Sequence, residues 1–75
     1  MEDIIKYWET DTRYYMAELV KDLLGDWTIY CNWGGKLNRR RGGKPIICSS
    51  YDDGLMKLGT LEKKRINRKY KEITR

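Results

Sequence analysis

The stretch Arg13–Trp33, RYYMAELVKDLLGDWTIYCNW, decides the fold expected for this chain. From Arg13 to Val20, aromatic and aliphatic residues alternate with the period of two that is typical of a half-buried β-strand. The same alternation returns from Trp27 to Trp33, where every second residue, including both tryptophans, falls on one face. The short connection between these segments ends in the turn signal Gly25-Asp26. The stretch therefore predicts an antiparallel hairpin.

Glycine pairs and one proline divide the chain beyond this hairpin. Gly34-Gly35 is expected to break the second strand, because paired glycines weaken a strand and permit positive φ. A brief third strand is expected from Lys36 to about Arg40, and Gly42-Gly43 is expected to form a flexible turn. Pro45 then opens the last strand, Ile46 to Tyr51, since a missing N–H is tolerated where a strand begins.

The C-terminal third predicts a helix. Asp52 and Asp53 follow two serines, which suits a helix N-cap and the helix dipole. Apolar residues then recur at helical spacing from Leu55 to about Tyr70, with lysine and arginine on the other faces. Gly59 interrupts this pattern, and close packing of the helix on the sheet is the use expected for it.

The predicted fold class is α+β, a small antiparallel sheet of about four strands packed by one C-terminal helix. A chain of 75 residues has room for one domain. Residues 1–12 have mixed character and are interpreted either as an N-terminal arm or as a short strand. Residues 13–75 are interpreted as the domain itself.

Composition argues against several classes of protein. The chain has no histidine, which removes the commonest general base and metal ligand, so we expect neither an enzyme nor a metal site nor another cofactor. Cys31 and Cys48 are too few for a zinc site of cysteines, and both are interpreted as small apolar residues. No apolar run is long enough to span a membrane, and the acidic start is unlike a secretory signal. A cytoplasmic location is expected.

The net charge of +5 is distributed unevenly along the chain. Through Gly35 the charge is −4, whereas from Lys36 onward it is +9. The excess concentrates in Lys36–Lys44 and in Lys63–Lys71, and neither segment contains an acid. Two such clusters in one half indicate a polyanion partner, although each cluster alone is also typical of a solvated surface.

Several features in a fixed order resemble the WGR domain, a small module named for a Trp-Gly-Arg tripeptide. They are Arg13-Tyr14-Tyr15 on the first strand, Leu23–Trp27 at the hairpin, Trp33-Gly34, the run Arg39–Gly43, and a helix that ends in lysine and arginine before Tyr70. The resemblance covers about residues 13–70 and is strongest to stand-alone bacterial versions. It implies an antiparallel sheet with one helix and a role in binding nucleic acid, because the motif's tryptophan and arginine contact DNA in DNA-break-sensing poly(ADP-ribose) polymerases. Gly35 stands here in place of that arginine.

The predicted function is therefore a non-catalytic nucleic-acid-binding module, with DNA favoured over RNA and little sequence specificity, because no base-reading helix is apparent. Phosphate contacts are expected to supply most of the affinity. The candidate binding residues are Trp33, Lys36, Arg39, Arg40, Arg41, Lys44, Lys64 and Arg68. Trp33 fits either the core or a rim with one ring face open to stacking. The alternative function is a protein–protein interaction module that binds an acidic partner or self-associates through its sheet.

Overall fold

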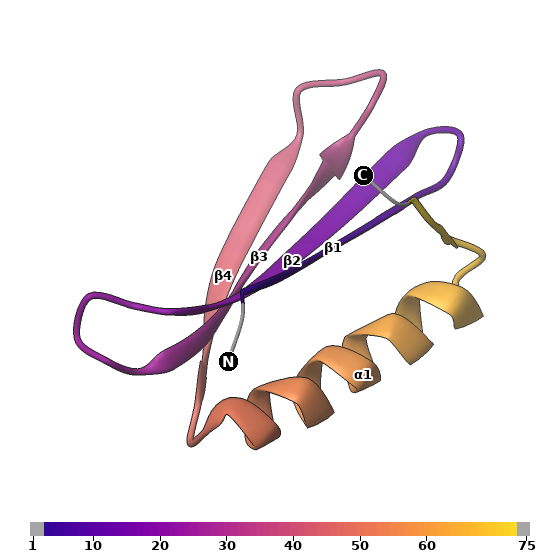
Figure 1. Ribbon diagram of the computed structural model, residues 1–75. Coiled ribbons are helices and arrows are strands. Elements are labelled where there is room, and N and C mark those ends of the chain that lie inside the picture. The colour runs from indigo at the N-terminus through magenta and orange to yellow at the C-terminus, as the bar shows by residue number, and fades with distance from the viewer. Residues whose placement is uncertain (1–2, 74–75) are drawn as a thin grey trace.

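A computed structural model of the protein describes residues 3–73, which form one antiparallel sheet with a helix on one face (Figure 1). The strands lie in the order β4-β3-β2-β1-β5. This arrangement confirms the predicted α+β fold, with five strands instead of about four. The elements are β1 (Ile4–Glu9), β2 (Arg13–Lys21), β3 (Trp27–Gly35), β4 (Arg41–Cys48), α1 (Tyr51–Asn67) and β5 (Lys71–Glu72).

The N-terminal segment forms strand β1 inside the sheet, so of the two interpretations, arm or short strand, the strand is confirmed. It pairs with β2 along its whole length and with β5 at Trp8 and Glu9. Trp8 lies opposite Tyr15 and is completely buried, so β1 contributes a central part of the core. Residues 1 and 2 of the predicted segment 1–12, and residues 74 and 75 of segment 13–75, lie outside the described residues.

The glycine pairs do not interrupt the sheet, so the sequence predictions for this region are wrong. Gly34-Gly35 continues β3 opposite Arg13 and Tyr14, and Gly42-Gly43 lies inside β4. The third strand expected at Lys36–Arg40 is a loop. The strand expected at Ile46–Tyr51 is β4, which begins at Arg41 and ends at Cys48, so Pro45 lies inside the strand and Tyr51 begins α1.

Aromatic rings explain why these glycines stay in strands. A Cβ atom on Gly34 would lie 3.0 Å from the ring of Tyr14, and one on Gly42 would lie 2.5 Å from Nε1 of Trp33. Each ring therefore lies against a neighbouring glycine and supplies the packing that the glycine lacks.

The hydrophobic core lies between α1 and the inner face of the sheet. Tyr15, Ala17 and Leu19, which share one face of β2, are buried there. On the helix it is Gly54, not Gly59, that permits close packing. A Cβ on Gly54 would lie 2.6 Å from Cδ1 of Leu19, whereas a Cβ on Gly59 would meet nothing within 4 Å.

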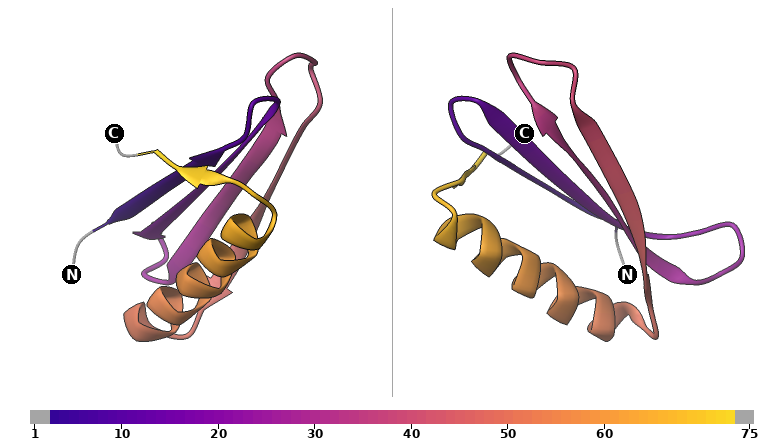
Figure 2. Two further views of the ribbon diagram at one scale, coloured as in Figure 1. Left: turned by 90° about the vertical axis from the view of Figure 1, so that its right-hand side faces the viewer. Right: turned by 180° about the vertical axis from the view of Figure 1, so that it is seen from behind.

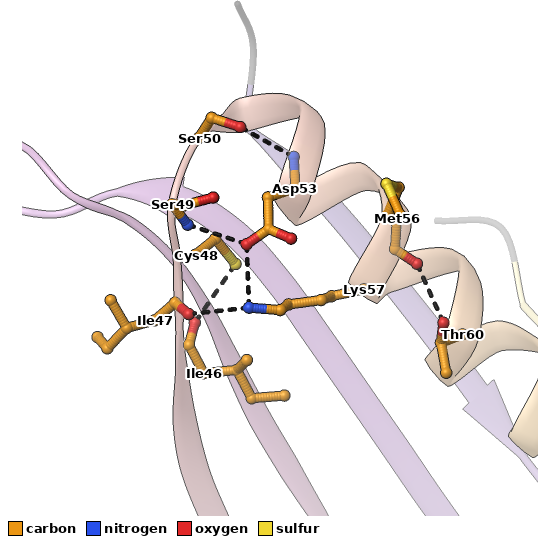
Figure 3. Close-up of polar contacts among 9 residues, drawn as sticks. All are labelled: Ile46, Ile47, Cys48, Ser49, Ser50, Asp53, Met56, Lys57 and Thr60. Atoms are coloured by element: carbon orange, nitrogen blue, oxygen red, sulfur yellow. Dashed lines mark hydrogen bonds and ion pairs between the residues drawn. The ribbon is translucent and has the colours of Figure 1, made fainter.

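The start of α1 is fixed by its cap (Figure 3). The backbone N–H of Asp53 donates to Oγ of Ser50 at 3.1 Å, and the Asp53 carboxylate accepts from the N–H of Ser49 at 2.9 Å. Lys57 binds the same carboxylate at 3.0 Å and also donates to the carbonyl of Ile47 at 3.2 Å. The hydrogen bond from Ser49 and the ammonium of Lys57 hold the pKa of Asp53 below its usual value. These contacts join the end of β4 to the first turn of the helix.

Candidate functional site

The two ends of the sheet carry opposite charge. At one end lie the β1–β2 turn, the β3–β4 loop and the segment that follows α1 (Figure 2). At the other end lie the β2–β3 turn, with Asp22 and Asp26, and the start of α1, with Asp52 and Asp53. The charge asymmetry along the sequence therefore becomes a polarity along the molecule, and the basic end is the candidate site.

A surface hollow of about 510 Å³ opens at the basic end. Three guanidinium-bearing residues and two aromatic residues are among those that line it, and we call it the arginine hollow. Its lining consists of Thr12, Arg13, Tyr14, Trp33, Gly34, Gly35, Leu37, Asn38, Arg40 and Arg41. Guanidinium groups beside rings suit an anionic ligand that also has flat or apolar parts.

The backbone of the β3–β4 loop sets the shape of this hollow. The N–H of Gly35 donates to the carbonyl of Arg40 at 3.2 Å, and the N–H of Arg40 donates to Oδ1 of Asn38 at 2.9 Å. The Asn38 side chain lies so close to Gly35 that a Cβ there would be only 2.5 Å from its oxygen. A side chain at position 35 would displace the Asn38 side chain and break its hydrogen bond with Arg40. Arg13 is the residue paired with Gly35 across the strands.

Trp33 lies partly in the core and partly at the rim, the two environments that its sequence position allows. Its ring stacks on that of Tyr15 at a centroid distance of 5.7 Å and an interplanar angle of 7°, so it belongs partly to the core. It is not fully buried, and it also lines the arginine hollow. The indole is thus held by packing on one side and available at the hollow.

A second hollow, of about 640 Å³, adjoins the first and shares Thr12 with it. We call it the lysine hollow; it is lined by Glu9, Thr10, Asp11, Thr12, Lys36, Lys69, Lys71 and Ile73. The ammonium of Lys36 lies 2.9 Å from the Glu9 carboxylate, which offsets part of its charge. The acids in its lining make this hollow less suited to a polyanion than the arginine hollow.

The structure brings together only part of the predicted site. Trp33, Arg40 and Arg41 line the arginine hollow, Lys36 lines the lysine hollow, and Arg39 is exposed in the loop between β3 and β4. Arg39 lines neither hollow, and the same is true of the other three predicted residues. They are Lys44 on β4, Lys64 in the last turn of α1, and Arg68 at the helix C-cap.

Arg13 and Tyr14 line the arginine hollow but are not among the candidate binding residues of the sequence analysis. The signal that locates them is the strand register, which sets Arg13 opposite Gly35 and Tyr14 opposite Gly34.

Arg65 belongs to the second cationic segment of the sequence but not to the basic surface. Its side chain is 8% exposed, and its guanidinium carbon lies 4.1 Å from the ring centroid of Tyr15 and 5.2 Å from that of Tyr70. Its Nε is buried with no hydrogen-bond partner in the part of the chain that the structure describes. Helical spacing alone could have placed this residue, since it continues the buried stripe of Leu58 and Leu61 on α1.

No group of three histidine, cysteine, aspartate or glutamate side chains is arranged to hold a metal ion between residues 3 and 73. No helix in the same range is long and apolar enough to cross a membrane.

Comparisons with protein-family models, with curated proteins and with solved structures give no match to this chain.

Proposed function

We propose that this protein is a non-catalytic nucleic-acid-binding module of the WGR type, which binds DNA mainly through its phosphates. The observation that carries the proposal is the arginine hollow, where Arg13, Arg40 and Arg41 lie around a partly open indole. Guanidinium groups bind phosphate oxygens with two parallel hydrogen bonds, and an indole face can stack on a base or a sugar. The hollow at the end of the sheet suits the end of a duplex or a single strand.

Arg13 takes the role of the arginine that the WGR motif has at its third position. Gly35 occupies that position here, and the Asn38 side chain fills the space beside it. Arg13 is the cross-strand neighbour of Gly35 and lines the same hollow, so a guanidinium is present near the motif from another strand. Lys36, which follows Gly35, is engaged by Glu9 and is the weaker substitute.

The proposal is tested by fluorescence anisotropy with a short labelled DNA duplex that has a free end. If about four phosphates are neutralised, log K is expected to fall with log salt at a slope of about −3 to −4. The double variant Arg40→Ala/Arg41→Ala is expected to weaken binding and to reduce the magnitude of the slope by about 2. Arg13→Ala is expected to weaken binding further in the same background.

The matched control is Lys21→Ala/Lys63→Ala, which removes the same charge from exposed positions that line neither hollow. It is expected to leave the affinity within about twofold at about 150 mM salt, where exposed charges are screened beyond about 8 Å. Binding that does not respond to salt, or equal losses in the arginine and the control variants, would contradict the proposal. A separate Lys64→Ala/Arg68→Ala variant measures what the helix end contributes.

A further inference from the structure

The β2–β3 turn presents two leucines to solvent. Leu23 is 106% exposed and Leu24 is 88% exposed, the largest values among the exposed hydrophobic residues of the described chain. The hairpin that carries them projects beyond the body of the molecule, away from the helix (Figures 1 and 2). We call this pair the leucine tip. Single exposed apolar residues are ordinary, but two adjacent leucines at a projecting turn point to a docking element.

Hydrogen bonds to the Asp22 carboxylate order the backbone of the leucine tip. One oxygen of this carboxylate accepts hydrogen bonds from the N–H groups of Leu24 and Asp26, both at 2.9 Å, and the other accepts from the Thr28 hydroxyl at 3.1 Å. The hydrogen bond from Asp26 is the main cause that lowers the pKa of Asp22, so the carboxylate stays charged. Gly25 takes the positive φ of 87° that closes the turn. A tip ordered in this way loses little conformational entropy on docking.

Charge narrows the choice of partner. Asp22 and Asp26 flank the two leucines, and the first turn of α1 adds Asp52 at the same end of the molecule. Lys57 offsets the charge of Asp53 there, and Lys21 precedes Asp22, so the acids exceed the lysines without being alone. An acidic rim repels nucleic acid and anionic lipid surfaces. The surface that fits the tip is an apolar hollow bordered by cations, because leucine side chains then lose water while carboxylates meet opposite charge.

The arginine hollow at the other end of this same chain has that chemistry. Trp33, Tyr14 and Leu37 supply its apolar lining, and Leu37 is itself 83% exposed. Arg13, Arg40 and Arg41 supply cations around these residues. Its volume of about 510 Å³ lies within the range of about 300–1,000 Å³ seen for sites that bury small ligands.

We propose that the leucine tip of one copy of this protein docks into the arginine hollow of another copy, so that the protein associates head to tail. The tip and the hollow lie at opposite ends of the sheet, so one contact leaves a tip and a hollow unoccupied, and further copies can add. The interface is small, as is typical of weak and transient association. A docked tip occupies the hollow assigned above to DNA, so self-association and DNA binding exclude each other at that site.

Complementation between two defective variants tests this contact. Leu23→Ser/Leu24→Ser removes the tip and keeps the hollow, whereas Arg40→Glu/Arg41→Glu reverses the charge of the hollow and keeps the tip. Leu55→Ser/Met56→Ser is the matched control, because it removes another adjacent pair of exposed apolar residues, on the helix. Circular dichroism and thermal melts of the wild type and each variant establish that all of these proteins are folded.

Sedimentation equilibrium without nucleic acid provides the measurement, over total concentrations from about 10 μM to 1 mM. The average mass of the wild type and of the helix control is expected to rise with concentration, and to rise less at about 1 M salt, where the Debye length is about 3 Å. The tip and hollow variants are each expected to stay monomeric alone and to form a 1:1 dimer, and nothing larger, when mixed. For the tip variant alone and for the hollow variant alone, the affinity of self-association is expected to fall at least tenfold.

Three results would overturn the head-to-tail contact. These are a wild type that remains monomeric up to the highest concentration, a tip variant that associates like the wild type, and a mixture of the two variants that does not dimerise. None of them bears on DNA binding, which is measured separately on the arginine variants, so the two proposals can fail independently.

Discussion

Replacing Arg65 tests how a buried guanidinium is accommodated in this small core. We expect Arg65→Met to change the free energy of unfolding by less than about 1 kcal/mol and Arg65→Ala to lower it by about 2–4 kcal/mol. In the native protein the guanidinium carbon lies over Tyr15 at 4.1 Å and near Tyr70 at 5.2 Å. A contact of this kind is worth about 0.5–1 kcal/mol at an exposed site and about 2 kcal/mol or more when it is desolvated.

An opposing cost arises from Nε of Arg65, which is buried without a hydrogen-bond partner among residues 3–73. A buried donor left unpaired costs about 1–3 kcal/mol, and more where the group is charged, so this cost opposes the gain from the two rings. Methionine removes both effects while it fills most of the volume, and its sulfur recovers about 0.3–1.5 kcal/mol against the aromatic rings. Alanine also removes the buried methylenes and leaves a cavity, so it is the more damaging change.

Urea denaturation followed by tryptophan fluorescence measures the difference, provided that the slope m is unchanged. For a domain of this size, a loss of about 1 kcal/mol corresponds to about 4–8 °C in Tm, so thermal melts give an independent value. If methionine proves as destabilising as alanine, the guanidinium itself contributes the stability, and the reasoning from its unpaired Nε is refuted.

Four further substitutions test glycine packing, the helix cap and the Asp22 carboxylate. Gly54→Ala is expected to lower the free energy of unfolding by about 1–3 kcal/mol, because the new Cβ would lie 2.6 Å from Leu19. Gly59→Ala is expected to raise it by about 0.5–1 kcal/mol, because a Cβ there meets open space, and equal effects in urea melts would contradict this. Ser50→Ala removes the N-cap acceptor and is expected to cost about 0.5–2 kcal/mol, with loss of helix signal in circular dichroism before global unfolding. The lowered pKa of Asp22 contributes stability that is present above its unfolded value of about 3.9 and is lost as pH falls through the folded value, so Asp22→Asn is expected to flatten the acid limb of a stability–pH curve.

The central hairpin could be predicted because its signal is local. Period-two alternation in Arg13–Val20 and Trp27–Trp33 identifies both strands, and Gly25-Asp26 identifies the turn between them. The helix followed from its serine and aspartate cap and its leucine spacing, although it ends at Asn67 and not near Tyr70.

The glycine-containing strands could not be predicted because what holds them is not local. Gly34 and Gly42 stay extended because the rings of Tyr14 and Trp33 lie against them. The residues next to the glycines in the sequence do not indicate that these rings pack on them. The same limit applies to the candidate site, since Arg13 enters the hollow through register with Gly35 and not through any cluster of cations.

The contact between Trp33 and Gly42 also makes substitutions at these two positions depend on each other. The indole lies where any side chain at position 42 would have to go, with a Cβ only 2.5 Å from its Nε1. A methyl group at 42 becomes tolerable once a smaller residue replaces the tryptophan, and restoring the tryptophan then requires glycine again. Homologous chains are accordingly expected to change at these two positions together. The order of substitution during divergence is also constrained, because Trp33 must be replaced by a smaller residue before Gly42 can be replaced by a larger one.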